Sequence, residues 1–306
     1  MIGTLSDTKT IAAARGLGRR FGDVAALDGV DFSLQENKIY GLLGRNGAGK
    51  TTLMQILTGQ EFQTSGAVEV FGRAPHENAR VLTDVCFVKE SQKYPDDFKV
   101  RHVLASARHL LPHWDEELAQ TLLADFDLPP GRKVKKLSRG MTSALGVTVG
   151  LASRAPLTLF DEPYLGLDAV ARHLFYDRLL ADYAEHPRTV VLSTHLIDEV
   201  SDLIEHVILI DRGRIVLDED ADALREGAVV VSGLASLVAD FTSNKTVLHR
   251  ESLGGHERAT VQTTLSDTER DRAVDEGLRF EPLSLQQLVV RSTTAAGTTA
   301  GKEDAR

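Results

Sequence analysis

The sequence predicts an α/β protein with a largely parallel main sheet, followed by a smaller α+β region. From Thr10 to about Leu217, strand-like runs alternate with helical patterns, which is typical of parallel sheets with crossover helices. The strand-like runs are rich in Val, Ile and Leu, as expected for strands that are covered on both faces. With 306 residues, the chain is long enough for one large domain and a smaller one.

The individual elements are predicted in order along the chain. Short apolar runs predict core strands at residues 38–43, 157–160, 189–193 and 207–210. Between residues 99 and 155 the apolar spacing becomes helical, which predicts helices at 100–111, 115–126 and 141–152. The sequence therefore predicts a helical insertion, over about residues 99–155, within the α/β body.

A second region begins near residue 225. Its patterns predict strands at 229–231 and 259–264 and helices at 234–241, 267–276 and 283–290. We therefore predict an accessory region over 225–291, a main domain over 10–224 and an N-terminal extension over 1–9. Residues 292–306 are rich in Thr, Ala and Gly, a composition that cannot bury a core, so we predict a disordered tail.

The composition excludes several classes of protein. A net charge of −9 argues against a nucleic-acid binder that relies on a basic surface, so no nucleic acid is expected as a partner. The single cysteine, Cys86, excludes internal disulfides and suits a reducing compartment. No apolar run approaches the ~18 residues that a membrane span needs. These features predict a soluble, cytosolic chain.

Residues 44–51 match the phosphate-binding pattern Gly-x-x-x-x-Gly-Lys-[Ser/Thr] at every fixed position. The glycines let successive backbone N–H groups point inward around a phosphate. Lys50 brings a positive charge to the outer phosphates, and the Thr51 hydroxyl can bind Mg²⁺. Because the loop lies between a predicted strand and a predicted helix, the helix N-terminus also favours an anion. The sequence therefore predicts a nucleotide-binding site.

Two adjacent carboxylates, Asp161 and Glu162, follow the apolar run at 157–160. In phosphate-loop enzymes an Asp at a strand end holds Mg²⁺, and the Glu that follows can polarise the attacking water. Taken alone, the pair is also compatible with an acidic helix N-cap, but Lys50 upstream favours the metal site. His195 ends another predicted strand, where an imidazole can act as a polar sensor of the γ-phosphate.

The motifs, in this order, resemble the ATP-binding cassette of ABC transporters over about residues 10–225. Phe21 lies where the family's aromatic residue stacks on adenine, and residues 137–141 occupy the position of the family signature. Residues 165–168 resemble the D-loop, and His195 the switch histidine. The resemblance implies the cassette form of the P-loop NTPase fold, with a RecA-like core sheet, an antiparallel β subdomain and the helical insertion.

The resemblance also implies a role for each matching residue. Glu162, His195 and Lys50 are expected to be catalytic, and Thr51, Asp161 and Glu90 are expected to hold Mg²⁺. The residues expected to bind ATP are Phe21, Gly44, Arg45, Asn46, Gly47, Ala48, Gly49, Lys50, Thr51, Thr52, Ser138 and Gly140. In the family, the signature residues complete the site of the other subunit.

Two positions depart from the family pattern. The signature is usually Leu-Ser-Gly-Gly-Gln, and here Arg139 and Met141 replace its third and fifth residues. Arg139 either adds a charge near the phosphate or faces solvent. At the position where Gln is common the chain has Glu90, with Gln92 two residues on, and either of them is a candidate for the metal shell.

The function implied is that of an ATP-hydrolysing subunit, with ATP and Mg²⁺ as cofactors, that closes as a dimer and powers a separate membrane permease. The partners implied are a second ATPase subunit, identical or different, and a permease docked on the helical insertion at the inner face of the cell membrane. Met141 and residues 280–288 resemble exporters. The alternative is a soluble ATP-switched binding module. It is disfavoured because the chain has no second cassette and no long coiled coil.

Overall fold

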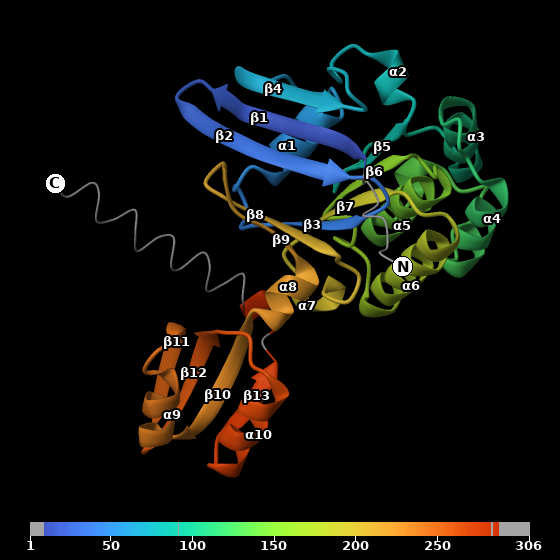
Figure 1. Ribbon diagram of the computed structural model, residues 1–306. Coiled ribbons are helices and arrows are strands. Elements are labelled where there is room, and N and C mark those ends of the chain that lie inside the picture. Colours follow the sequence, from blue (N-terminus) through green and yellow to red (C-terminus); the bar gives the residue numbers. More distant parts are fainter. Residues whose placement is uncertain (1–8, 91, 283, 288–306) are drawn as a thin grey trace, which may run out of the picture. The chain divides into compact units, whose positions relative to one another are not determined.

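The computed structural model describes residues 9–90, 92–282 and 284–287 (Figure 1). The chain divides into two compact units. The first unit comprises Met1–His195 and Ile208–Ile215, and the second comprises Leu196–Val207 and Val216–Arg306. The larger unit holds the phosphate loop and both strand-end motifs.

A sheet of six strands has its first four strands wholly within the larger unit. Its order is β5 (Val85–Val88), β6 (Leu157–Asp161), β7 (Thr189–Thr194), β3 (Ile39–Leu43), β8 (His206–Asp211) and β9 (Arg214–Asp220). The first four of these strands pair in parallel. Every residue of β3, β6 and β7 is buried, which is why these strands are continuous apolar runs in the sequence. The predicted parallel core is confirmed.

A second, antiparallel sheet has the order β2 (Val24–Gln35), β1 (Thr10–Phe21) and β4 (Ser65–Val70). Between the two sheets lies helix α1 (Lys50–Leu57), directly after the phosphate loop (Figure 1). Leu53, Met54, Ile56 and Leu57 of this helix belong to one core cluster with residues of both sheets. This packing anchors the helix whose N-terminus faces the site.

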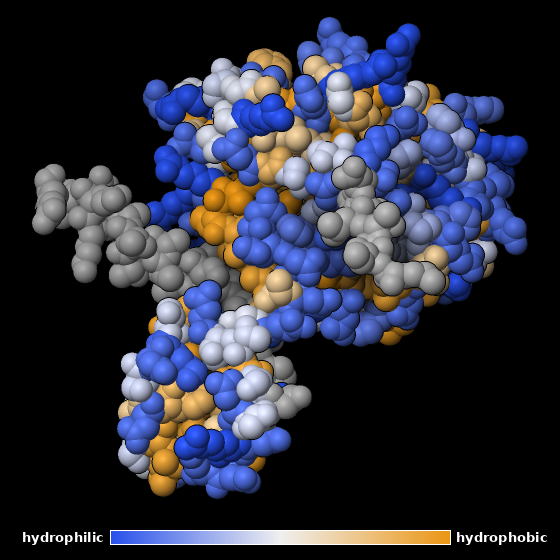
Figure 2. All heavy atoms as spheres, viewed as in Figure 1, coloured by the Kyte–Doolittle hydropathy of each residue, from blue (hydrophilic) through white to orange (hydrophobic). Residues whose placement is uncertain are grey.

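The helical insertion is formed by α3 (Val100–Leu110), α4 (Glu116–Asp125) and α5 (Arg139–Ala152), and α6 (Ala169–Glu185) packs against α5. A short helix, α2 (Ala79–Leu82), precedes β5, and a 3₁₀ turn, η1 (Val134–Lys136), precedes α5. α5 begins two residues earlier than predicted because Ser138 caps it, accepting a hydrogen bond from the Met141 N–H. Over α3 and α4 the surface is mostly hydrophilic, as expected for amphipathic helices (Figure 2).

In the second unit, strands and helices follow the order β10 (Ala228–Leu234), α9 (Ala235–Thr242), β11 (Thr246–Leu253), β12 (His256–Gln262), α10 (Asp267–Asp275) and β13 (Arg279–Pro282). Two short helices, α7 (Ile197–Val200) and α8 (Ala221–Glu226), come before them. The antiparallel sheet has the order β11-β12-β10-β13, which is the ferredoxin-like arrangement. The predicted α+β character is confirmed, but edge strands β11 and β13 were not predicted. β11 is almost entirely exposed, so it lacks apolar alternation.

Part of the prediction concerns residues that the structure does not describe. The extension at 1–9 is described only at Lys9, and the predicted tail at 292–306 lies outside the described residues. The predicted helix at 283–290 is described only in part, with residues 285–287 helical. Among the described helices, none is long and apolar enough to cross a lipid bilayer.

Candidate active site

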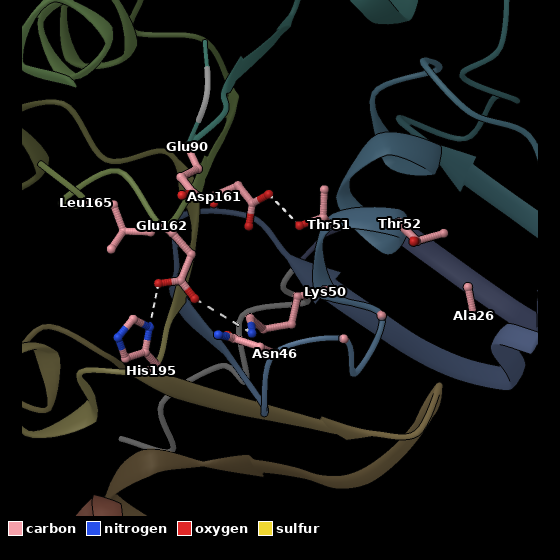
Figure 3. A pocket seen from close by; sticks show the side chains of 12 residues that line it. Ala26, Asn46, Lys50, Thr51, Thr52, Glu90, Asp161, Glu162, Leu165 and His195 are labelled. Carbon is pink, nitrogen blue, oxygen red and sulfur yellow. Dashed lines mark hydrogen bonds and ion pairs between the residues drawn. The ribbon is translucent and has the colours of Figure 1, made fainter. Parts of the chain in front are cut away.

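A pocket of about 400 Å³ lies where the phosphate loop meets the ends of β6 and β7. Figure 3 shows side chains from the loop, from the strand ends and from the segment after β5 converging on it. Its lining consists of Ala26, Asn46, Gly47, Gly49, Lys50, Thr51, Thr52, Glu90, Asp161, Glu162, Leu165 and His195. Residues that lie far apart in the sequence, from Ala26 to His195, therefore share one pocket.

The phosphate loop requires glycine at specific positions. Gly44, Gly47 and Gly49 have φ of +153°, +79° and +114°, which side chains rarely allow. A Cβ on Gly44 would lie 2.3 Å from the carbonyl oxygen of Ile210, and one on Gly49 would lie 2.6 Å from that of Ala26. The loop runs directly into α1, so its N–H groups and the helix N-terminus form an anion site.

The Lys50 ammonium is buried at the base of the loop. Its Nζ donates hydrogen bonds to the carbonyl oxygens of Gly44 at 2.8 Å and Arg45 at 3.3 Å. The same Nζ lies 3.7 Å from Oε1 of Glu162. These contacts hold a positive charge at the pocket, where it can meet a phosphate oxygen.

Asp161 is held on both of its oxygens. Thr51 Oγ1 donates to Oδ2 at 2.7 Å, and Ser193 Oγ donates to Oδ1 at 2.9 Å. Glu90 lines the same pocket. A hydroxyl and two carboxylates are the oxygen donors that Mg²⁺ prefers, so these residues fit that ion.

Glu162 lies between Lys50 and His195 (Figure 3). His195 Nδ1 is 2.7 Å from Glu162 Oε2, and the hydroxyl of Tyr164 also donates to Oε2. Burial, followed by the hydrogen bond to Glu162, raises the pKa of Tyr164, so its hydroxyl stays protonated. Glu162 itself has a left-handed backbone, with φ of +49°, a conformation that costs energy and often marks a functional site.

The predicted site residues divide into three groups. Ten of them line the pocket, namely Asn46, Gly47, Gly49, Lys50, Thr51, Thr52, Glu90, Asp161, Glu162 and His195. Gly44 and Arg45 contribute backbone oxygens to Lys50, and Ala48 closes the loop by bonding to the Arg45 oxygen. Phe21, Ser138 and Gly140 are not among the lining residues.

Phe21 is 45% exposed, and the guanidinium of Arg19 lies 4.4 Å from its ring centroid. Arg19 also lies 4.6 Å from the ring of Phe62 and pairs with Glu61. The guanidinium of Arg19 therefore makes a cation–π contact with the ring of Phe21. The exposed part of the ring remains available for stacking.

Ser138 and Gly140 line a different pocket of about 600 Å³, together with Gly166, Asp168 and residues near them. A Cβ on Gly140 would lie 2.6 Å from the carbonyl oxygen of Gly166, so only glycine lets the start of α5 approach that loop. The signature and the D-loop therefore line one surface hollow, although Gly140 and Gly166 are 26 positions apart in the sequence. Within one chain, the signature and the phosphate loop belong to different pockets.

The two departures from the family pattern meet in space. Arg139 Nη2 lies 3.3 Å from Oε1 of Glu90, so Arg139 is an ion-pair partner as well as a largely exposed side chain. Of the two candidates for the metal shell, Glu90 lines the pocket and Gln92 does not.

Two residues of the site were missed from the sequence. Ser193 holds Asp161, and Tyr164 contacts both Glu162 and His195. A hydroxyl residue two positions before the strand-end His195, and a phenol two residues after Glu162, are the signals that were available.

Comparisons with known proteins identify the family of this chain. A family model described as ABC transporter matches residues 27–165. The Nod factor export ATP-binding protein I of Burkholderia lata is 32% identical over 225 residues, covering 70% of this chain and 72% of the relative. The ATP-binding protein YtrB of Bacillus subtilis is 25% identical over 212 residues, covering 69% and 73%.

Solved structures share the fold. The ATP-binding subunit of an ABC transporter aligns with a TM-score of 0.64 at 22% identity, covering 71% of this chain and 92% of that one. A dimeric ATP-binding cassette bound to ADP and phosphate aligns with a TM-score of 0.61 at 20% identity, covering 69% and 99%. The fold is that of the ABC ATPase cassette.

The chain is thus an ATP-binding, ATP-hydrolysing protein of the phosphate-loop class. It belongs to the ABC transporter family, as an ATP-binding subunit.

Proposed function

We propose that this chain is the ATPase subunit of an ABC exporter, which closes as a dimer on ATP and drives a separate membrane permease. The observation that carries the proposal is the pair of half-sites. Lys50, Thr51, Asp161, Glu162 and His195 line one pocket, while Ser138 and Gly140 line another. A second cassette would bring its Ser138 and Gly140 over the ATP held by the first.

In the hydrolytic site, Lys50 and His195 stabilise the γ-phosphate charge and Glu162 orients and activates the attacking water. Thr51 and Asp161 would hold Mg²⁺, with Glu90 beside them. When bound, that ion neutralises phosphate charge and polarises the bond to be broken. The phosphate loop, residues 44–51, binds the phosphates and Thr52 extends the helix N-terminus. Phe21 stacks on the adenine.

Dimer closure follows from the contacts that only ATP supplies. The γ-phosphate bridges the phosphate loop of one subunit and the signature of the other, so ATP favours the closed state and ADP does not. A twofold arrangement uses both half-sites of both chains. Homodimers and heterodimers satisfy the geometry equally.

Export is the direction we infer, supported by Met141 in the signature and by the names of the Nod factor export relatives. The permease would dock on the helical insertion, which places this chain in the cytoplasm at the inner face of the membrane. We assign the ATPase domain to residues 10–224, and the region 225–291 to an accessory role.

The catalytic assignment is tested with Glu162→Gln in the full chain with Mg-ATP. The amide cannot accept the proton of water, so we expect ATP turnover to fall by about 100-fold or more. Light scattering should then show a trapped species of about twice the monomer mass of 33.4 kDa. The double variant Glu162→Gln/Ser138→Arg is the control: it keeps the phosphate loop but should remain monomeric. Wild-type turnover in Glu162→Gln would refute the assignment.

The transport role is tested by purifying the tagged chain from its own membranes in mild detergent. We expect a polytopic membrane protein to co-purify, and to be lost when exposed side chains of α3 such as Arg101 and Arg108 are reversed to Glu. Recovery of the chain only from the soluble fraction, with no membrane partner, would instead support the soluble binding module.

A further inference from the structure

We propose that Tyr164 is a positioning residue for ATP hydrolysis, whose hydroxyl fixes Oε2 of Glu162 and the ring of His195 so that Oε1 of Glu162 meets the attacking water. This inference rests on the proposed role of Glu162. It assigns a function to a residue outside the phosphate loop, the two strand-end motifs and the signature.

The hydroxyl of Tyr164 uses its whole hydrogen-bonding capacity in this cluster. A phenol has one donor and two acceptor positions. It accepts from Thr194 Oγ1 at 3.0 Å and from the backbone N–H of His195 at 3.1 Å. Its single hydrogen is therefore directed to Glu162 Oε2. The phenol has one orientation in which all three bonds are made.

These bonds give the two oxygens of Glu162 different roles. Oε2 accepts from Tyr164 and faces His195 Nδ1 at 2.7 Å. Oε1 has no hydrogen-bond partner within the described part of the chain, and Lys50 Nζ lies 3.7 Å away. With Oε2 saturated, Oε1 is the oxygen that remains to accept a hydrogen bond from water.

The same contacts orient His195. An ionised carboxylate only accepts, so the hydrogen between Glu162 Oε2 and His195 lies on Nδ1. Nδ1 is also 3.0 Å from the Tyr164 oxygen. Nε2 is then the ring nitrogen that is left to face the pocket that His195 lines.

The surroundings make the arrangement rigid. Tyr164 is 3% exposed and Thr194 is 1% exposed, so water does not compete for these bonds. Glu162 has a left-handed backbone, with φ of +49°, and such conformations persist where the neighbouring structure enforces them. The bond from Leu165 N–H to the Glu162 carbonyl closes the turn around Tyr164.

Tyr164→Phe in the full chain removes the hydroxyl and keeps the ring. We expect kcat for ATP to fall on the order of 10- to 100-fold, the scale of a hydrogen bond to a charged group. KM and Mg-ATP affinity should stay close to wild type, because the phosphate loop is untouched, whereas Tm should fall modestly because two buried donors lose their acceptor. Tyr183→Phe is the matched control. It deletes a phenol bonded to the Asn37 carbonyl, neither residue lines the pocket, and kcat should stay unchanged.

Loss of kcat together with a comparable loss of Mg-ATP affinity would mean that Tyr164 only supports the fold, and would overturn the inference. In the Glu162→Gln background, adding Tyr164→Phe should lower the residual rate much less than it lowers the wild-type rate, because its main effect passes through Glu162. An additional 10-fold loss in that double variant would also overturn it.

The failure of this inference can be separated from that of the proposed function. If Glu162→Gln keeps wild-type turnover, the role of Glu162 is wrong. If Glu162→Gln is inactive and Tyr164→Phe turns over at the wild-type rate, only the role of Tyr164 is wrong. Should Tyr164→Phe not fold, Thr194→Val removes one donor to the phenol and should lower kcat a few-fold at unchanged KM. Unchanged kcat in that variant would then overturn the inference.

Discussion

At the scale of single residues, burial decides what a titratable group can do. Lys50, Asp161 and Glu162 are all less than 10% exposed, and each has a partner of opposite charge or a hydrogen-bond donor or acceptor. Cys86 is also buried, but it lies outside the pocket lining. Burial holds the charged groups of the pocket in place, and the same burial makes this thiol inert.

Burial raises the pKa of the Cys86 thiol to about 11, against smaller opposing effects of Ser153 and Arg188. At pH 8 the native thiol is therefore almost fully protonated, and the thiolate is the reactive form. We expect iodoacetamide to label the native protein at least about 100-fold more slowly than the urea-unfolded protein. Because Cys86 is the single cysteine, intact mass spectrometry measures this directly. Equal labelling rates would show that the thiol is accessible in the native state.

The pKa shift also has a consequence for stability. The folded state holds the Cys86 proton more tightly than the unfolded state. The contribution of this proton to the free energy of unfolding is therefore complete below the unfolded pKa, near 8.5. It is lost as pH rises towards the folded pKa of about 11.

At the scale of elements, α5 links the signature to the strand that leads into the carboxylates that we propose for the active site. Ser138 caps the helix at one end, and further along Gly150 packs against Phe160, the residue before Asp161. At the start of the helix Arg139 pairs with Glu90. A movement of α5 would therefore be transmitted to the pocket through two contacts, that of Gly150 with Phe160 and that of Arg139 with Glu90.

Gly150→Ala tests how tightly α5 packs on β6. The new Cβ would lie 2.4 Å from Cε1 of the fully buried Phe160 and 2.8 Å from Val88. Overpacking of about 1–3 kcal/mol outweighs the helix propensity gained by alanine, so the free energy of unfolding should fall by about 1–2 kcal/mol. Gly131→Ala, which has no atom within 4 Å of the new Cβ, is the control. Denaturant titration measures the free energy of unfolding of both variants. A Gly150→Ala variant more stable than wild type would show that α5 moves to accommodate the new methyl group.

At the scale of the molecule, the main feature is that the larger unit has two separate pockets, which we propose are two half-sites. The pocket beside Lys50 and the pocket beside Ser138 have separate linings. Chemistry that needs both sets of residues therefore needs a second chain. The trapped dimer expected for Glu162→Gln, and its loss with Ser138→Arg, is the test at this scale.

Much of the fold could be predicted from the sequence because the signals are local. The strands β3, β6, β7 and β8 were predicted because strands buried on both faces are continuous apolar runs. Helices α3 and α4 were predicted from their spacing. Edge strands β11 and β13 were missed because exposed strands pair through their backbones and need no apolar pattern.

By itself, the sequence determined the phosphate loop, since positive φ at Gly44 and Gly49 and the charge of Lys50 are properties of those residues. It also determined that Asp161, Glu162 and His195 end strands. Only the tertiary structure decided which side chains meet. Thr51 bonds to Asp161 from 110 residues away, Arg139 turns to Glu90, and Tyr164 closes on Glu162 and His195. Backbone conformation depends on near neighbours, whereas these contacts exist only after distant segments have packed together and excluded water.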